Sequence, residues 1–451
     1  MQSMKALRIL LAMILTFGLV LAACSNNEES TSSETTDTST DTSTEATETQ
    51  EVITIKYPTF NVGAHVTAKS EEVIINAFKE KFKGQIELEL EEYPGDQAYI
   101  DKMKVLAATK ELPLVVGGKN GVKDLAVKNG QAVDLRTFFE QDPDFRAQFS
   151  DEVIAANTSE DGSIYSLATE AFVIGYYYNK DMFADAGIEP AKTWEEFMSN
   201  NEKLKAKGYT PISLMTGENS WTTNLTLAAM IASHSPEGLA WMNKKYPETY
   251  QVPAVIDSLK MIQTLFQKYT TPDALGGVYN NAANNFNQGQ TAIIANGPWM
   301  IADFSSREKS MEGFENKVGV AQFPGGGMVF AFQEGLMIAK QDNTTDAELQ
   351  AAWELFKALS DSEAQVIRME MVGFFPSAKV EIPEAFKASN PIFADYVDES
   401  NAATTKFLYF DIQSYPSVVD AFGQLYPELA NGNITAEEMA AKLDEAAAKN
   451  K

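Results

Sequence analysis

The chain has 451 residues, 44% of them hydrophobic, and a formal net charge of −27 at pH 7. This length exceeds what one hydrophobic core usually takes up, which predicts two lobes. The strong negative charge argues against nucleic-acid binding, which requires a basic surface. A single cysteine and two histidines exclude an internal disulfide and a metal site built from Cys and His.

Residues 1–23 have the features of a secretory signal, because Lys5 and Arg8 precede an apolar run that is too short for a membrane span. The run ends in Leu-Ala-Ala-Cys24, which resembles the signal of bacterial lipoproteins. In that class the cysteine is lipidated and becomes the first residue, so we predict a lipid anchor on Cys24. The alternative is an ordinary cleaved signal followed by an incidental cysteine.

Residues 24–51 are predicted to be a disordered acidic linker. Ser, Thr, Asp and Glu dominate this segment, and it has no aromatic residue. Such a composition cannot bury enough apolar surface to offset the entropy of ordering. We expect a tether that lifts a folded domain off a membrane, and its length suggests a Gram-positive cell surface.

The stretch from Asp161 to Phe197 predicts α/β organisation. The apolar run of residues 171–178 is typical of a strand buried on both faces. A short helix is expected to begin at Asn179 or Lys180 and to end at Gly187. Thr193 with Glu196 predicts a capping box for the next helix, over residues 194–207.

The rest of the chain continues this pattern. In the N-terminal part, period-2 and helical spacing predict strands at 52–57, 86–90 and 112–116 that alternate with helices at 73–82 and 97–110. Further on we expect a helix at 252–268 and strands at 318–323 and 335–340. Capping boxes are predicted at Thr345/Glu348, Ser360/Glu363 and Thr435/Glu438.

Five motifs stand out along the chain: Asp161-Gly162-x-Ile164-Tyr165, Tyr178-Asn179-Lys180-Asp181-x-Phe183, Ala186-Gly187-Ile188, Thr193-Trp194-Glu195-Glu196-Phe197, and Phe286-x-x-Gly289-x-x-Ala292-Ile293 followed by Gly297-x-Trp299. With these motifs the chain resembles the family-1 extracellular solute-binding proteins of carbohydrate ABC importers, which are similar to maltose-binding protein. Ile293 stands where that family usually has Met.

The resemblance implies an α/β, two-lobed periplasmic-binding-protein-like fold of type II with three hinge crossings. The crossings are expected near residues 169–171, 324–330 and 374–376. The first lobe would comprise residues 52–169 plus 328–375, and the second lobe residues 170–327 plus 376–451.

Enzyme motifs are missing from the sequence. There is no His-Glu-x-x-His, no Gly-x-Ser-x-Gly, no P-loop and no Gly-x-Gly-x-x-Gly. A carboxylate pair for glycoside hydrolysis remains open, because 63 acidic residues offer many pairs and spacing in sequence does not fix separation in space.

Trp299 is the first candidate for an aromatic contact to a sugar, since a Gly297-Pro298 turn at the end of a strand would present its indole. Packing in the core is the alternative. Trp221 is the second candidate, because polar residues flank it. Glu170 follows the first crossing and could accept two hydroxyl bonds, although a solvated loop carboxylate is nearly as good an interpretation.

Five further ligand contacts are predicted from their positions in the chain. Asn61 and His65 lie on the loop after the first strand, where family members contact ligand, although for His65 alone a plain surface histidine is the better interpretation. Asn120 follows the short strand at 112–116. Gly327 and Phe375 belong to the second and third expected crossings.

The resemblance therefore implies a lipid-anchored extracellular protein that captures a mono- or oligosaccharide by lobe closure and delivers it to ABC permease subunits. We expect a monomer on the outer face of the cytoplasmic membrane, held there only by its lipid, without a cofactor or metal. A secreted carbohydrate-active enzyme is one alternative. The other is a binding protein for a non-sugar solute such as a peptide or a polyamine.

Overall fold

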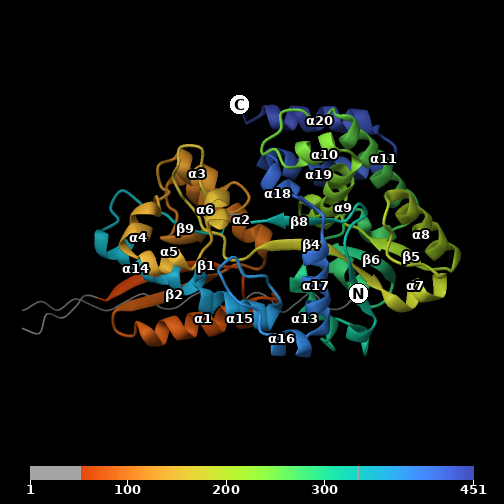
Figure 1. The fold of residues 1–451 in the computed structure, drawn as a ribbon. Helices are drawn as coiled ribbons and strands as arrows, with labels where there is room; N and C mark the ends of the chain where they lie inside the picture. The colour runs from red at the N-terminus through yellow and green to blue at the C-terminus, as the bar shows by residue number, and fades with distance from the viewer. Residues whose placement is uncertain (1–51, 333–334, 451) are drawn as a thin grey trace, which may run out of the picture. The chain divides into compact units, whose positions relative to one another are not determined.

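The computed structural model describes residues 52–332 and 335–450, so the predicted signal, Cys24 and the linker lie outside the described residues. Within the described ranges, helices and strands are interspersed along the chain (Figure 1). The strands of this part form a β1–β2 pair, a β3–β9 pair and a six-stranded sheet. The helices and strands pack into two sets, and each set has its own hydrophobic clusters. The two sets of elements are described in turn.

The first set joins the N-terminal segment to residues from the last third of the chain. Strands β1 (Ile53–Thr59) and β2 (Ile86–Glu92) run parallel, and β3 (Val115–Gly117) pairs antiparallel with β9 (Leu336–Ile338). The helices around them are α1 (Ala68–Lys81), α2 (Asp96–Thr109), α3 (Val122–Lys128), α4 (Arg136–Gln141), α5 (Pro143–Ala147), α6 (Asp151–Asn157), α14 (Asp346–Ser360) and α15 (Ser362–Val372).

The second set surrounds the six-stranded sheet, whose order is β10-β8-β4-β6-β5 with β7 also paired to β4. Its strands are β4 (Phe172–Asn179), β5 (Thr210–Ser213), β6 (Thr291–Asn296), β7 (Val318–Ala321), β8 (Gly327–Ala331) and β10 (Thr405–Phe407). Its helices are α7 (Lys180–Ala186), α8 (Trp194–Ala206), α9 (Trp221–His234), α10 (Pro236–Met242), α11 (Pro253–Lys268), α12 (Tyr279–Asn287), α13 (Ile301–Phe304), α16 (Glu384–Ser389), α17 (Pro391–Ala402), α18 (Phe410–Gln413), α19 (Pro416–Ala430) and α20 (Ala436–Ala448).

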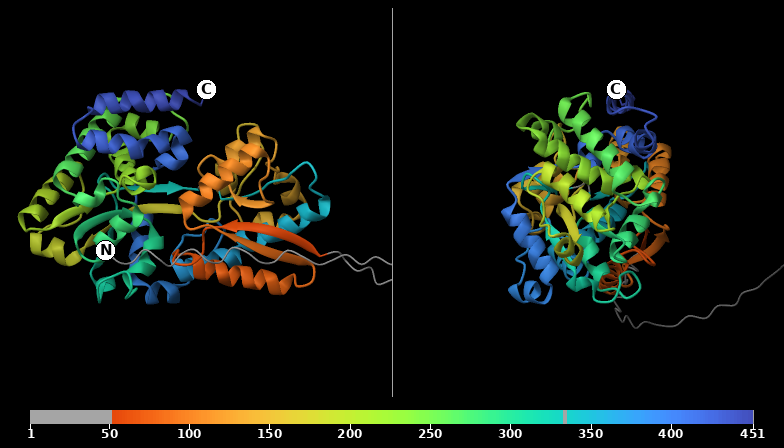
Figure 2. Two further views of the ribbon diagram at one scale, coloured as in Figure 1. Left: turned by 180° about the vertical axis from the view of Figure 1, so that it is seen from behind. Right: turned by 90° about the vertical axis from the view of Figure 1, so that its right-hand side faces the viewer.

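Strand β4 is the centre of this sheet, as its continuous apolar sequence predicts. It is antiparallel to β6, β7 and β8, and Tyr176 and Tyr177 on its two faces are both buried. The Tyr177 hydroxyl donates to the Gly297 carbonyl at 2.9 Å. The C-terminal helix α20 packs against both α19 and α11, so the end of the chain closes over this set (Figure 2).

Local capping explains why the helices begin where they do. Asn179 accepts hydrogen bonds from the N–H groups of Asp181 and Met182, and Gly187 ends α7 with a φ of 63°. The capping boxes of Thr345 with Glu348 and of Thr435 with Glu438 are both present, as predicted. At α8, Thr193 caps the Glu196 N–H as expected, whereas the Glu196 side chain accepts from Lys192.

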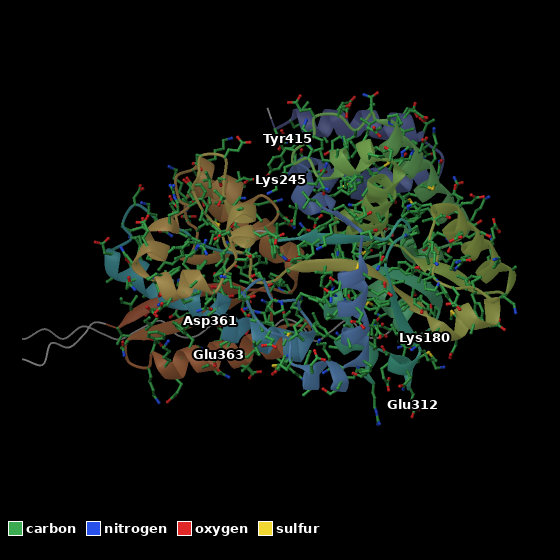
Figure 3. The ribbon with its side chains drawn as sticks, in the orientation of Figure 1. Lys180, Lys245, Glu312, Asp361, Glu363 and Tyr415 are labelled. Carbon is green, nitrogen blue, oxygen red and sulfur yellow. The ribbon has the colours of Figure 1, made fainter. Side chains whose placement is uncertain are left out.

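The predicted capping box of Ser360 and Glu363 is wrong. Ser360 is the last residue of α14, and its hydroxyl donates to the Phe356 carbonyl. Asp361, one position later, caps α15 by accepting from the Ala364 N–H at 2.8 Å. A carboxylate caps a helix at least as well as a hydroxyl, so α15 begins after Asp361. Figure 3 labels Asp361 and Glu363 at this connection between α14 and α15.

Short bridges join segments of the two sets near the start of β4. Leu167 and Leu336 form an isolated antiparallel bridge, as do Ala171 and Phe375. The Ala171 N–H donates to the Phe375 carbonyl at 2.7 Å. Segments that are distant in sequence therefore meet at one place, next to the start of β4.

Two stretches near the predicted lobe boundaries pack differently from the prediction. Residues 328–331 lie in β8, which pairs with β4, so they belong with the second set. Ser377 donates to the Ala168 carbonyl, and Ala378 forms a bridge with Phe149, so this stretch belongs with the first set.

Candidate ligand-binding cavity

A cavity of about 480 Å³ is lined by residues from both sets of elements. Its volume is typical of small-molecule binding sites. The first set contributes the loop after β1, the start of α2 and the residues after β3. The second set contributes β4 and the starts of α9 and α12. Ligand in this cavity would therefore contact both halves of the molecule.

One wall of the cavity is aromatic. The ring centroid of Trp299 lies 6.2 Å from that of Trp221, 5.5 Å from Phe172 and 5.9 Å from Phe374. Tyr279 extends the wall beyond Trp221, at 5.1 Å. All five rings line the cavity. Such a surface offers flat apolar faces to a ligand that is apolar on one side.

The local sequence explains how Trp299 reaches this wall. Strand β6 ends at Asn296, and Pro298 begins the short 3₁₀ helix of residues 298–300. A Cβ on Gly297 would lie 2.1 Å from the Trp299 ring. Glycine is thus required at position 297 because the indole fills the space that any side chain would take.

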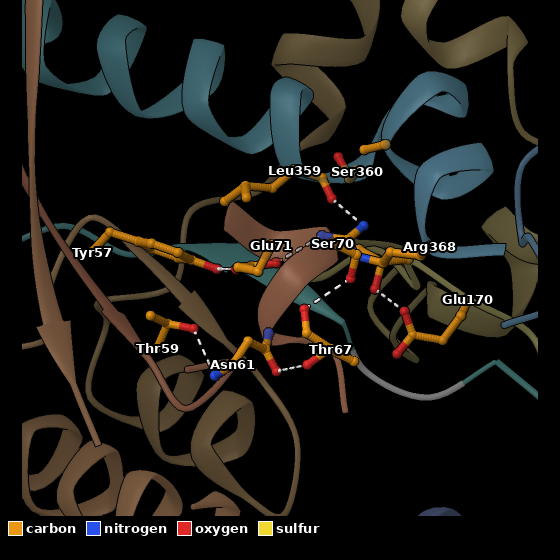
Figure 4. A network of polar contacts seen from close by, with 12 residues as sticks. Tyr57, Thr59, Asn61, Thr67, Ser70, Glu71, Glu170, Leu359, Ser360 and Arg368 are labelled. Carbon is orange, nitrogen blue, oxygen red and sulfur yellow. Dashed lines mark hydrogen bonds and ion pairs between the residues drawn. The ribbon is translucent and has the colours of Figure 1, made fainter. Parts of the chain in front are cut away.

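The loop after β1 supplies polar groups to the cavity (Figure 4). The Thr67 hydroxyl donates to the Asn61 side-chain oxygen at 2.6 Å, and it lies 2.6 Å from Nδ1 of His65. The backbone N–H of Asn61 donates to the Thr59 hydroxyl at 3.1 Å. These bonds hold Asn61 and His65 in place before any ligand arrives.

A buried ion pair lies beneath this loop. Glu71, in the first turn of α1, is 1% exposed and accepts from the Tyr57 hydroxyl at 2.7 Å (Figure 4). Arg368 of α15 is 3.4 Å from the other Glu71 oxygen, and it donates to the Leu359 carbonyl at 2.7 Å. Burial, with the Glu71 charge adding to it, raises the pKa of Tyr57 well above its usual value, so this hydroxyl stays a donor.

Further polar residues line the cavity beside these. Thr169 donates to the Glu170 carboxylate, which leaves the other carboxylate oxygen for a ligand. Lys119 forms a 2.7 Å ion pair with Asp96 and lies 4.5 Å from the centre of the Phe60 ring. Asn120 lines the cavity with a left-handed backbone, at a φ of 55°.

The structure brings six of the predicted ligand contacts to this cavity, and these are Trp299, Trp221, Glu170, Asn61, His65 and Asn120. Gly327 and Phe375 are outside its described lining. Gly327 lies in β8, where the Phe407 ring would be 3.0 Å from an added Cβ. Phe375 is buried and stacks on Phe393 at 5.1 Å, while the ring beside it in sequence, Phe374, lines the cavity instead.

Several lining residues are not predicted from the sequence: Phe172, Tyr279, Phe374, Tyr409 and Arg368. Phe172 stacks with Tyr409 at 5.9 Å, across a long separation in sequence. No local pattern predicts such a pair. The apolar run of β4 does predict a buried strand, but it does not say which residue at its end reaches a cavity.

His65 is expected to be uncharged at neutral pH. Burial lowers its pKa from 6.5 to about 4, and the Lys119 charge acts in the same direction. Between pH 6.5 and 4 the unfolded chain therefore binds the proton and the folded protein does not, so the His65 contribution to stability declines as pH falls through this window. Above about pH 6 we expect ligand affinity to be independent of the His65 charge.

An NMR titration of the imidazole signals tests this directly, since the only other histidine is His234 and a His234→Asn variant assigns the two. His65→Gln should lessen the loss of stability on acidification. A His65 signal that titrates near 6.5 would contradict the buried, neutral state.

The described residues contain no group of three or more His, Cys, Asp or Glu side chains arranged to hold a metal ion. Among the described helices, none is both long enough and apolar enough to span a membrane.

Comparison with known proteins agrees with this architecture. The chain is 27% identical over 169 residues to the "Multiple sugar-binding protein" of Streptococcus mutans, a match over 36% of this chain and 39% of that protein. It is 25% identical over 252 residues to the "sn-glycerol-3-phosphate-binding periplasmic protein" of Brucella melitensis, over 54% of this chain and 56% of that protein. Both matches thus span less than two thirds of the relative.

Solved structures match over a larger share of the chain. A "Chitin oligosaccharide binding protein" superposes with a TM-score of 0.75 and 26% identity, over 88% of this chain and 98% of that chain. A Streptococcus pneumoniae solute-binding protein in complex with the blood group A-trisaccharide gives 0.74 and 20% identity, over 88% and 99%, which shows the shared two-lobed α/β fold. The family model "Bacterial extracellular solute-binding protein" matches residues 74–395. The chain therefore belongs to the bacterial extracellular solute-binding proteins.

Proposed function

We propose that this protein captures a mono- or oligosaccharide in the 480 Å³ cavity and delivers it to the permease subunits of an ABC importer. The observation that carries the proposal is the pairing of an aromatic wall, Trp299 with Trp221, with hydrogen-bonding side chains in one cavity. A pyranose has apolar C–H faces that stack on rings and hydroxyls that need polar partners. The names of the sugar-binding relatives support the same ligand class.

An uncharged ligand fits the cavity better than a phosphate ester does. Its two cationic side chains are already engaged, Lys119 with Asp96 at 2.7 Å and Arg368 with Glu71 at 3.4 Å. Binding a phosphate would require one of these pairs to break. We therefore favour a sugar over the glycerol phosphate that names the Brucella relative.

A thermal-shift screen against neutral sugars tests this function. Chito-oligosaccharides, raffinose, maltose and the blood group A-trisaccharide are suitable probes, since solved proteins of this fold are named for the first and are in complex with the others. A ligand at a hundred times its dissociation constant adds about 2.7 kcal/mol of stability and raises the melting temperature. Stabilisation by glycerol 3-phosphate alone would refute the sugar assignment, and steady release of cleaved glycoside would favour the enzyme alternative.

We also propose that the two lobes close on the ligand about three hinge crossings, the first near residues 168–171, the second between β8 and β9, and the third near residues 373–376. A saturating sugar from the screen should reduce the radius of gyration in solution scattering, with the protein remaining a monomer. The same protein without added sugar provides the control. No compaction with a verified ligand would contradict closure.

Lipid anchoring through Cys24 at the outer face of a Gram-positive membrane completes the proposal. It is supported by the Leu-Ala-Ala-Cys motif, and two acyl groups hold a protein firmly where one is marginal. Cys24→Ala should release the protein into the medium or leave the precursor uncleaved. Correct cleavage with unchanged membrane retention would contradict the anchor.

A further inference from the structure

The turn of residues 218–220 has an unusual backbone and borders the cavity. Glu218, Asn219 and Ser220 have φ values of 47°, 58° and 61°, in the left-handed region where residues with a Cβ are disfavoured. They are three of the six non-glycine residues with positive φ in the described ranges, and Asn120, a fourth, also lines the cavity. Strain of this kind persists only where the surrounding structure enforces it.

Buried hydrogen bonds hold the turn from within. The Ser220 hydroxyl donates to the Thr216 carbonyl at 3.0 Å. The Asn224 side chain donates to the Asn219 carbonyl at 3.0 Å, and its oxygen accepts from the Tyr426 hydroxyl at 2.7 Å. Asn224 is 1% exposed, and its bond with the Tyr426 hydroxyl is buried. The turn is therefore fixed before ligand binds.

The same turn is tied to the start of α12. The Gly217 N–H donates to the Gly277 carbonyl at 2.8 Å, and the Glu218 carboxylate accepts from the Tyr279 N–H at 2.9 Å. A carboxylate at this position also interacts favourably with the positive end of the α12 dipole. The link keeps the Tyr279 ring beside Trp221, the residue that follows the turn.

Two asparagines close in sequence to this ring pair have side-chain amides without a hydrogen-bond partner in the described part of the chain. Asn219 and Asn280 both line the cavity, and neither side-chain amide hydrogen-bonds to any residue in the ranges 52–332 and 335–450. An amide offers two donors and an acceptor, which suits the edge of a sugar ring.

We infer that the turn at 218–220 is a preformed saccharide-binding element, in which the Asn219 and Asn280 amides bind hydroxyls of the sugar ring that stacks on Trp221 and Tyr279. The inference rests on the proposed function and assigns it a subsite. Because the turn is rigid before binding, the ligand does not lose affinity by having to order it. This gain in affinity is what the strained backbone provides.

The test is calorimetric titration of wild type, Asn219→Gly and Ser220→Gly with tri-N-acetylchitotriose, raffinose and the blood group A-trisaccharide. Glycine adopts a left-handed backbone without strain, so Asn219→Gly should leave the melting temperature unchanged or raised while lowering affinity at least about tenfold. Ser220→Gly keeps the Asn219 amide, but it adds the same flexibility and removes the Ser220 hydroxyl bond to the Thr216 carbonyl. Because Ser220 does not line the cavity, we expect its loss of affinity to be at least about threefold smaller than that of Asn219→Gly. Asn280→Ala should weaken binding independently.

The outcomes separate the two proposals. If wild type binds a sugar and Asn219→Gly binds it equally well, the subsite is refuted while the proposed function stands. If Ser220→Gly loses as much affinity as Asn219→Gly, rigidity explains the effect and the amide contact is refuted. If wild type binds none of the sugars, the proposed function fails and the subsite with it.

Discussion

Trp299→Ala is expected to lower sugar affinity by about 2 kcal/mol or more, roughly 30-fold, as for a buried aromatic anchor. The indole is half-buried and joins Trp221, Phe172 and Phe374 in the cavity wall, so its loss removes the centre of the stacking surface. Without ligand, the variant should lose less stability than a core tryptophan variant does, because part of the ring already faces the cavity. Calorimetry and thermal unfolding measure the two effects.

Trp353→Ala is the matched control. Trp353 is 2% exposed and stacks on Phe356 and Phe138 in the core of the first set. Its truncation should cost about 3–5 kcal/mol of stability and leave the affinity of the folded fraction intact. Gly297→Ala is a second probe, because its Cβ would displace the indole without removing it. If Trp299→Ala behaved like Trp353→Ala, with lost stability and intact binding, Trp299 would be a packing residue.

Arg368→Ala is expected to destabilise the folded protein by about 3–5 kcal/mol. Removing the guanidinium leaves the Glu71 carboxylate buried with its charge uncompensated, and also removes the bond to the Leu359 carbonyl. The Tyr57 hydroxyl alone cannot replace a countercharge. Denaturant unfolding at pH 7 measures the loss.

A surface pair provides the comparison for this variant. Lys260 and Glu437 are 2.9 Å apart with side chains 51% and 55% exposed, so Lys260→Ala should cost much less stability than Arg368→Ala. Replacing both partners, as Glu71→Leu with Arg368→Met, should recover much of the stability that the single Arg368 variant loses. Equal small losses for Arg368→Ala and Lys260→Ala would show that the buried pair contributes no more than a surface one.

Much of the fold could be predicted from local sequence. The apolar run before Asn179 predicts a buried strand because only a strand covered on both faces needs no polar positions, and β4 is that strand. Asn179 and Gly187 delimit α7 because a side-chain oxygen caps one end and a left-handed glycine ends the other. The prediction failed at Ser360, where the adjacent Asp361 caps the helix instead.

The candidate site was only partly predictable, for a physical reason. Trp299 and Trp221 stand out because turn residues or polar neighbours surround them in sequence. Arg368 gives no such signal, since its role depends on Glu71, which lies far away in the chain. The left-handed turn at 218–220 contains no glycine, and tertiary hydrogen bonds rather than local preference impose its backbone.

A crystal structure with the tightest-binding sugar of the screen is the most direct test of carbohydrate capture in this cavity. We predict a sugar ring stacked on Trp299 or Trp221, with hydroxyls bound by Glu170, Asn61 or Asn219, and the cavity more enclosed than in a ligand-free crystal. A sugar bound elsewhere on the molecule, with the aromatic wall uncovered, would contradict the proposed function.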